Sequence, residues 1–172
     1  MGTTRPYPAG DPGPERSLPP ASPVPPTATE PEPSRQTRSL RLAGTPGVVS
    51  RAREFAREAL RDWGWLPSAS EMQRAAAEDV LLVVSELVTN ACLHADGPEE
   101  IRVGRSGKLL RVEVVDSGEG APALATTRRA GSPGGHGMFI VQRLCLDWGV
   151  TENPEIPGKT VWAELSGPSA GD

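Results

Sequence analysis

The chain has 172 residues and a formal net charge of −4, a length that suits one domain with a substantial hydrophobic core rather than two. The negative charge argues against direct nucleic-acid binding, because modules of that kind carry a basic surface. The N-terminus has no apolar segment of signal-peptide length and no later segment could span a bilayer, so we expect a soluble cytoplasmic protein with no membrane partner.

The two cysteines, Cys92 and Cys145, are far apart, and each lies in an apolar helical pattern. Without paired spacing they are expected to be buried free thiols, which suits a reducing cytoplasm. Zinc bound by these cysteines with His94 and His136 is an alternative, but no Cys-x-x-Cys or His-x-x-x-His pair supports it.

Composition divides the chain into a tail and a domain. Residues 1–37 are dominated by proline, with Ser, Thr, Glu and Gly between, and such a segment cannot bury enough apolar surface to offset its ordering entropy. We predict a disordered tail there, one ordered domain over residues 38–166 and a flexible C-terminus over residues 167–172.

The domain is predicted to begin with a short edge strand in SLRLAG, followed by a helix in TPGVVSRAREFAREALRDWG. Thr45 can cap this helix, and Pro46 suits its first turn. An arginine row, Arg53, Arg57 and Arg61, indicates a solvated face paired with neighbouring acidic residues, with a docking surface as the alternative.

A longer helix is predicted from about Ala69 to His94. Ser68 and Glu71 have the spacing of a capping box before it, and its apolar residues recur at helical spacing. The expected buried stripe is Ala76, Val80, Val83, Val84, Leu87 and Ala91.

The remaining elements are mostly strands. EEIRVGR and KLLRVEVVD are strand-like and are joined at Ser106-Gly107, which suits a hairpin turn. A third helix is predicted in HGMFIVQRLCLDW, and WGVTEN and KTVWAEL are again strand-like. Together they predict an α+β fold, a two-layer sandwich with a mixed, mostly antiparallel sheet and about three helices on one face.

Asp116 ends the strand in LLRVEVVDSGEG on the same face as Val112 and Val114, because strand side chains alternate. A carboxylate there only accepts hydrogen bonds, so it suits a ligand amino group. Gly118 and Gly120 would let the backbone approach a flat ring. A polar turn that merely ends the strand is the alternative.

The stretch GSPGGHGMFIV enters a predicted helix through several glycines. Free backbone N–H groups and the positive end of the helix dipole bind phosphate oxygens at such a helix start. Gly134, Gly135 and Gly137 are therefore candidates for a phosphate cradle. A flexible connection ending at a helix cap is the alternative.

Glu86 and Asn90 lie one helical turn apart on the border of the apolar stripe, and no Lys or Arg lies between Arg74 and Arg102. A carboxylate in apolar surroundings needs a compensating cation or hydrogen-bond donors. An Asn oxygen is a suitable Mg²⁺ ligand, and a nearby Glu can hold a metal-bound water or take a proton from an attacking hydroxyl. A polar helix edge facing solvent is the alternative.

In order and spacing, these motifs resemble a known family. The helix ELxxNAxxHA, the strand end DSGEG, the loop GGHGMFIV and the final GKTVWAEL resemble the ATP-binding fold shared by DNA gyrase, histidine kinases and MutL. VxELVTNAxxHA and TVWAEL are most similar to the anti-sigma-factor serine kinases of actinobacteria. The resemblance covers the whole predicted domain.

The resemblance implies ATP and Mg²⁺ as cofactors and assigns roles at matching positions. Asn90 would hold the Mg²⁺ that bridges the phosphates, and Glu86 would be the catalytic base. Asp116 would bind the adenine amino group, with Gly118 and Gly120 shaping the base pocket.

On the phosphate side, the resemblance implies that Gly135, Gly137 and Met138 lie along the phosphates, with a mobile lid over residues 121–134. His136 stands where many relatives have Arg, which would weaken the phosphate grip or make it depend on pH.

Further positions complete the implied pocket. Thr160 matches the position that helps hold adenine, and His94 is expected in the pocket wall. The lid residues Arg128 and Arg129 either neutralise charge in the transition state or are simply solvated.

The implied function is that of an ATP- and Mg²⁺-dependent serine/threonine protein kinase regulating transcription. It would phosphorylate a serine of an antagonist protein, hold a sigma factor when free, and form a homodimer. A non-catalytic module that binds ATP only to shape a partner surface is the alternative. Gly158-Lys159-Thr160 is not a P-loop, because the required first glycine falls at Asn153 and a strand follows.

Overall fold

The computed structural model describes residues 34–94, 96–118, 137–155 and 157–167, all within one unit of the chain, Pro31–Asp172. Five strands in this part form one sheet in the order β1-β2-β3-β5-β4, and every neighbouring pair is antiparallel. The strands are β1 (Gln36–Arg41), β2 (Pro98–Ser106), β3 (Leu109–Asp116), β4 (Asp147–Glu152) and β5 (Lys159–Ser166).

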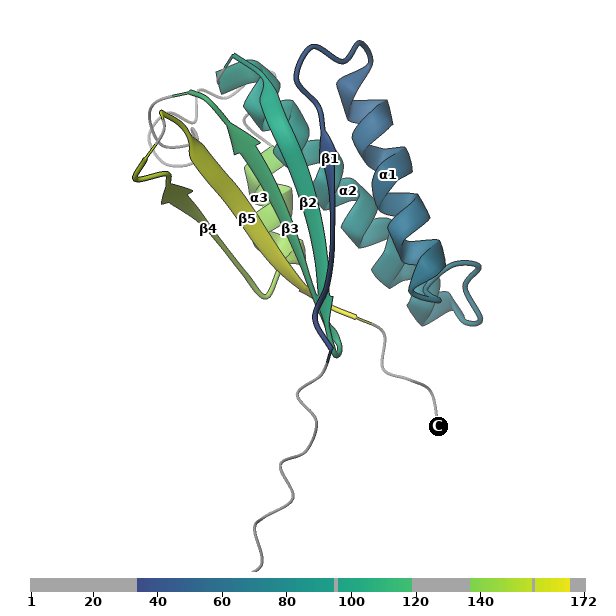
Figure 1. Ribbon diagram of the computed structural model, residues 1–172. Helices are drawn as coiled ribbons and strands as arrows, with labels where there is room; N and C mark the ends of the chain where they lie inside the picture. Colours follow the sequence, from purple (N-terminus) through teal and green to yellow (C-terminus); the bar gives the residue numbers. More distant parts are fainter. Residues whose placement is uncertain (1–33, 95, 119–136, 156, 168–172) are drawn as a thin grey trace, which may run out of the picture. The chain divides into compact units, whose positions relative to one another are not determined.

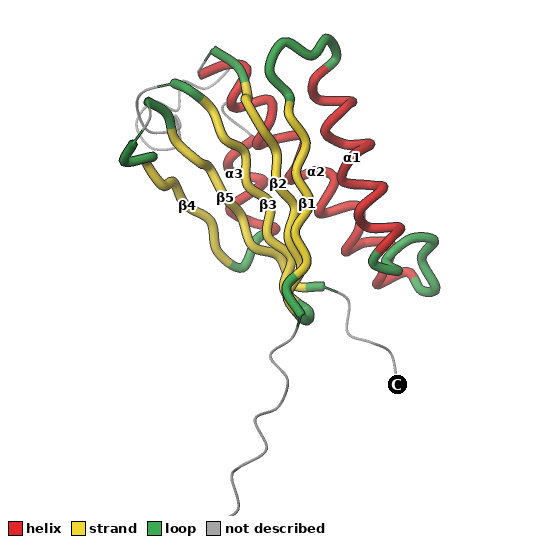
Figure 2. The backbone as a smooth tube through the Cα atoms, in the orientation of Figure 1, coloured by secondary structure: helices red, strands yellow, loops and turns green. Residues whose placement is uncertain are grey.

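The three helices of the described part cover one face of this sheet, which gives two layers (Figure 1 and Figure 2). They are α1 (Val48–Asp62), α2 (Glu71–His94) and α3 (Gly137–Leu144). The α+β two-layer sandwich expected from the sequence is confirmed. No helix in the described ranges is long and apolar enough to cross a membrane.

The core lies between the two layers and follows the strand and helix periods. Alternate residues of β3 are buried, namely Leu110, Val112, Val114 and Asp116. In β5 they are Lys159, Val161, Ala163 and Leu165. From α2, most of the predicted stripe is fully buried, including Val80, Val83, Val84 and Leu87, and each such side chain contributes roughly 1.5–3 kcal/mol on burial. Two charged residues, Asp116 and Lys159, therefore end otherwise apolar rows.

Two local predictions about turns are corrected by the backbone. Gly47 precedes α1 in the left-handed conformation, with φ of 60°, and no side chain caps the helix, so the prediction that Thr45 is the cap is wrong. In the hairpin, Ser106 pairs with Leu109. The two-residue turn is therefore Gly107-Lys108, one residue later than predicted.

The start of α2 uses a different capping pair from the predicted one. Ser70 Oγ accepts a hydrogen bond from the backbone N–H of Gln73 at 3.2 Å. Gln73 Oε1 in turn accepts one from the N–H of Ala69 at 2.7 Å. The predicted pair of Ser68 and Glu71 is wrong by two residues, although the kind of motif is the one expected.

Two of the three arginines in the row of α1, Arg57 and Arg61, form ion pairs along their own helix. Arg57 lies 2.5 Å and Arg61 3.2 Å from carboxylate oxygens of Glu54. The hydrogen bond from Arg57, followed by the one from Arg61, lowers the pKa of Glu54 below its ordinary value. These contacts favour a solvated, internally paired face over a docking surface.

Candidate nucleotide-binding site

The predicted site residues lie on elements that meet at one end of the sheet, the upper end in Figure 1. Three residues separate His94, the last residue of α2, from Pro98 at the start of β2, and Pro98 pairs with Asp116 at the end of β3. Such a connection spans at most about 3.6 Å per residue, so the end of α2 lies near the end of β3.

β4 ends at Glu152, which pairs with Lys159, so it runs toward the end of the sheet that holds Asp116. Only two residues separate the last residue of α3, Leu144, from the first residue of β4, Asp147, and the chain reverses there. The start of α3 therefore lies at the same end of the sheet as Asp116 (Figure 1).

Asp116 is buried at this end and is paired with a cation. Lys159 Nζ lies 3.0 Å from Asp116 Oδ1, and the two side chains are 4% and 0% exposed. The backbone N–H of Gly118 donates to the same oxygen at 2.9 Å. The other oxygen, Oδ2, is buried and has no hydrogen-bond partner. Since buried polar atoms are normally hydrogen-bonded, this acceptor is suited to a donor from a ligand.

Lys159, rather than Thr160, faces Asp116. The register of β3 and β5 places Lys159 opposite Asp116 and Thr160 opposite Val115. Side chains alternate along a strand, so Thr160 lies on the sheet face away from the helices. That Thr160 helps hold adenine stays a prediction, and this register places its side chain on the other face of the sheet from Asp116. Lys159 was missed, although its alternation with the apolar residues from Val161 onward was a readable signal.

Glu86 and Asn90 are placed on α2 as predicted from their spacing, but neither has a partner within the described part of the chain. Asn90 is 8% exposed and forms no hydrogen bond there. Glu86 is half-buried and forms no ion pair or hydrogen bond there. The neighbouring Leu87 and Ala91 belong to the core. The side of α2 that borders the core therefore carries an amide and a carboxylate that pair with no group in the described part of the chain.

The sequence of the domain matches the model of a known family. Residues 42–165 match the histidine kinase-like ATPase domain. The chain belongs to this family. Among curated proteins, none matches the sequence. Membership identifies the domain as ATP-binding, of the type shared by gyrase, histidine kinases and MutL.

The remaining predicted residues of the ATPase domain are only partly described. Gly137 and Met138 begin α3, and Met138 is buried in the core at 4% exposure. The His94 side chain lies outside the described residues, as do Gly120, Gly135 and His136, the lid over residues 121–134 and its Arg128 and Arg129.

The cysteines of the ATPase domain are both free, as predicted, but Cys92 is exposed rather than buried. Cys145 is half-buried, and burial, followed by the negative charge of Asp79, raises its pKa to about 12. Its thiol is therefore unreactive at neutral pH. No group of three His, Cys, Asp or Glu side chains gathers as metal ligands in the described ranges.

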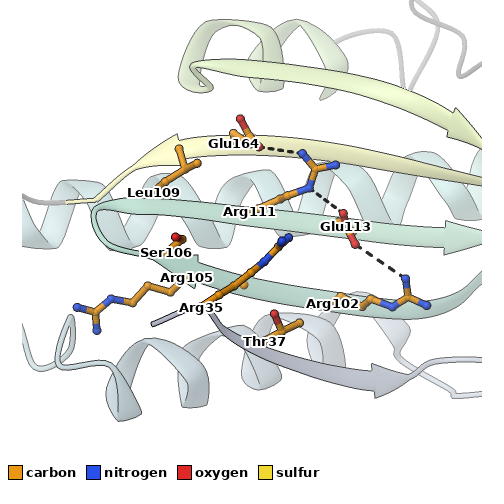
Figure 3. A pocket seen from close by; sticks show the side chains of 10 residues that line it. Arg35, Thr37, Arg102, Arg105, Ser106, Leu109, Arg111, Glu113 and Glu164 are labelled. Carbon is orange, nitrogen blue, oxygen red and sulfur yellow. Dashed lines mark hydrogen bonds and ion pairs between the residues drawn. The ribbon is translucent and has the colours of Figure 1, made fainter. Parts of the chain in front are cut away.

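A hollow of about 250 Å³ lies on the open face of the sheet, opposite the helices (Figure 3). Arg111 lies across it between Glu113 and Glu164, with nitrogen–oxygen distances of 2.7 and 2.8 Å. Its guanidinium also stacks 4.2 Å from the centre of the Trp162 ring. The hollow is lined by four arginines and two glutamates and contains none of the predicted site residues, so we do not assign the nucleotide to it.

A second hollow, of about 340 Å³, reaches the end of β3. Its lining includes Val115, Asp116, Ser117 and Asn153. Val115 points away from the helix layer, so this hollow approaches Asp116 from the open face. It does not include Glu86 or Asn90, which lie on the helix side.

Proposed function

We propose that this ATPase domain is an ATP- and Mg²⁺-dependent serine/threonine protein kinase of the anti-sigma type. It transfers the γ-phosphate of ATP to a serine of an antagonist protein in the cytoplasm. The observation that carries the proposal is the pair formed by Glu86 and Asn90 on α2. Both are at least half-buried, and neither has a partner among the residues that the structure describes.

The residues at the end of the sheet fit the chemistry of ATP. The oxygen of the Asn90 amide is a ligand type that Mg²⁺ accepts, alongside waters and phosphate oxygens. Bound there, Mg²⁺ would neutralise charge on the phosphates. The unused Oδ2 of Asp116 is an acceptor only, which suits the amino group of adenine. Catalysis of this kind relies mostly on positioning and charge neutralisation.

In the proposed reaction, Glu86 is the general base. A bond forms between the serine hydroxyl oxygen and the γ-phosphorus, and the bond from that phosphorus to the bridging oxygen of ADP breaks. The hydroxyl proton passes to the Glu86 carboxylate. A carboxylate held by an ion pair would be a poorer base, so the absence of a cation beside Glu86 in the described part favours this role.

The partner proteins of the proposal rest on the motif resemblance. ELVTNAxxHA and TVWAEL are similar to kinases that hold a sigma factor when free and release it to an antagonist. A homodimer is part of the same proposal. Co-purification of a sigma factor with the full chain, and sedimentation of the purified chain, test these two parts separately.

Phosphoryl transfer is tested with labelled ATP, Mg²⁺ and candidate antagonist proteins. We expect the wild type to label a serine of one antagonist. Glu86→Gln should bind ATP with unchanged affinity but transfer phosphate at least about 100-fold more slowly, the usual loss when a general base is removed. Glu78→Gln, on the exposed side of the same helix, is the matched control and should behave as the wild type.

Three outcomes of these experiments would contradict different parts of the proposal. Transfer at the wild-type rate in Glu86→Gln would show that Glu86 is not the base. ATP binding without transfer to any antagonist would favour the non-catalytic module that only changes a partner surface. No ATP binding by the folded wild type would refute the site as a whole.

A further inference from the structure

Among the described residues, the ion pair between Asp116 and Lys159 leaves one acceptor and one donor without a partner. Asp116 Oδ1 accepts from both Lys159 Nζ and the Gly118 N–H, whereas Oδ2 accepts from no group. An ammonium carries three N–H donors. Lys159 uses one on Oδ1 at 3.0 Å and one on the Gly118 carbonyl at 3.5 Å, and the third has no partner among the described residues.

Burial makes this incomplete pair informative. Lys159 is 3% and Asp116 1% exposed, so bulk water has little access to either side chain. A buried ion pair offsets its desolvation cost only when its remaining donors and acceptors are also satisfied. A pair that merely closed the end of the sheet would need no unused donor beside an unused acceptor.

We propose that Lys159 is a second residue that reads the nucleotide base, acting beside Asp116. The inference rests on the proposed binding of ATP at this site. Asp116 Oδ2 accepts from the amino group of adenine, and the third N–H of Lys159 donates to the neighbouring ring nitrogen, N1. Gly118 fixes the geometry by holding both side chains through its own N–H and C=O.

The pair of groups matches adenine and opposes guanine in the same orientation. Adenine presents an amino donor next to a ring nitrogen that only accepts. Guanine presents a carbonyl acceptor and a ring N–H at these two positions. Its carbonyl would face the carboxylate, and its ring N–H would face the ammonium, which leaves both buried charges without partners. Lys159 thus reads a feature of the base that Asp116 does not contact.

The test compares ATP with 1-deaza-ATP, in which N1 is replaced by CH and the amino group is kept. Affinities are measured by calorimetry for the wild type, Lys159→Met and Lys108→Met. We expect the wild type to bind 1-deaza-ATP about tenfold more weakly or worse, as for a lost hydrogen bond to a charged donor. Lys159→Met should bind the two nucleotides equally.

Lys108 is the chain's other lysine and is exposed in the hairpin turn, so Lys108→Met should keep the full preference for ATP. If Lys159 were purely structural, its replacement by Met would lower the affinity for ATP and for 1-deaza-ATP by the same factor. A preference for ATP that persists unchanged in Lys159→Met would therefore refute the proposal. Equal binding by the wild type would refute it as well. Failure of the wild type to bind either nucleotide would instead refute ATP binding itself.

A second measurement needs no variant, in case Lys159→Met does not fold. The nitrogen-15 resonance of N1 in labelled ATP is recorded free and bound to the wild-type chain. A hydrogen bond from a cation should move this resonance to lower frequency on binding. An N1 resonance at the same position in both states would overturn the proposal.

Discussion

At the scale of single residues, Gly158 decides which side chains meet at the end of the sheet. Its φ is +135°, a conformation that L side chains rarely adopt, and a Cβ there would overlap the backbone carbonyl of Asp116. This close approach holds the end of β3 against the start of β5. Gly158 directly precedes Lys159. The buried ion pair therefore depends on a glycine that itself contributes no side chain.

Gly158→Ala should lower the free energy of unfolding by about 2–3 kcal/mol, because both backbone strain and overlap must be accommodated. Urea denaturation measures the change. Gly44→Ala, with a φ of +69° but open space, should cost only about 1 kcal/mol. Gly104→Ala, where a Cβ would lie 3.4 Å from Thr37 Oγ1, should change stability by less than about 0.5 kcal/mol. Equal costs at all three positions would contradict this reasoning.

At the scale of elements, α2 carries the proposed catalytic pair, and its start is set by a capping motif. The sequence SASEMQ contains two overlapping frames for such a motif, Ser68 with Glu71 and Ser70 with Gln73. Only the second makes the capping hydrogen bonds. Sequence spacing could not choose between them, because the choice depends on where the preceding turn leaves the chain.

Ser70→Ala should destabilise the domain by about 1 kcal/mol, since it removes the acceptor for the Gln73 N–H. Ser68→Ala should cost less than about 0.5 kcal/mol. Thermal or urea denaturation of the two variants makes the comparison. The reverse order of costs would mean that α2 begins two residues earlier than the structure shows.

At the scale of the whole molecule, the proposed site joins the two layers. Asn90 and Glu86 come from the helix layer, while Asp116 and Lys159 come from the sheet. A nucleotide that contacts both layers binds the folded state and not the unfolded chain, so it must stabilise the domain. In the proposal, the contacts of the nucleotide with Asn90 and Asp116 supply this gain.

Mg²⁺ with ATP at about 100 times its dissociation constant should raise the free energy of unfolding by about 2.7 kcal/mol. Denaturation with and without nucleotide measures the increase. Removing Mg²⁺ with EDTA should reduce the increase, and CTP in place of ATP should give less. A folded chain whose stability does not change with millimolar ATP would contradict the proposed site.

Local sequence patterns were sufficient for the layers and for the elements on which several candidate residues lie. The apolar stripe of α2 and the alternation of β3 depend only on residue spacing, so the helix layer, the sheet and the inward direction of Asp116 could be predicted. Glu86 and Asn90 could be placed on the border of the α2 stripe in the same way, because polar residues beside an apolar stripe are visible without a structure, and their roles stay predictions.

The tertiary structure decided what the sequence left open. Cross-strand register is set by pairing between residues far apart in the chain, so only the structure could place Lys159 rather than Thr160 opposite Asp116. The choice of Ser70 as cap and the exposure of Cys92 also depend on neighbours from other segments. Spacing along the chain determines which way a side chain points, but only the folded chain determines what it meets.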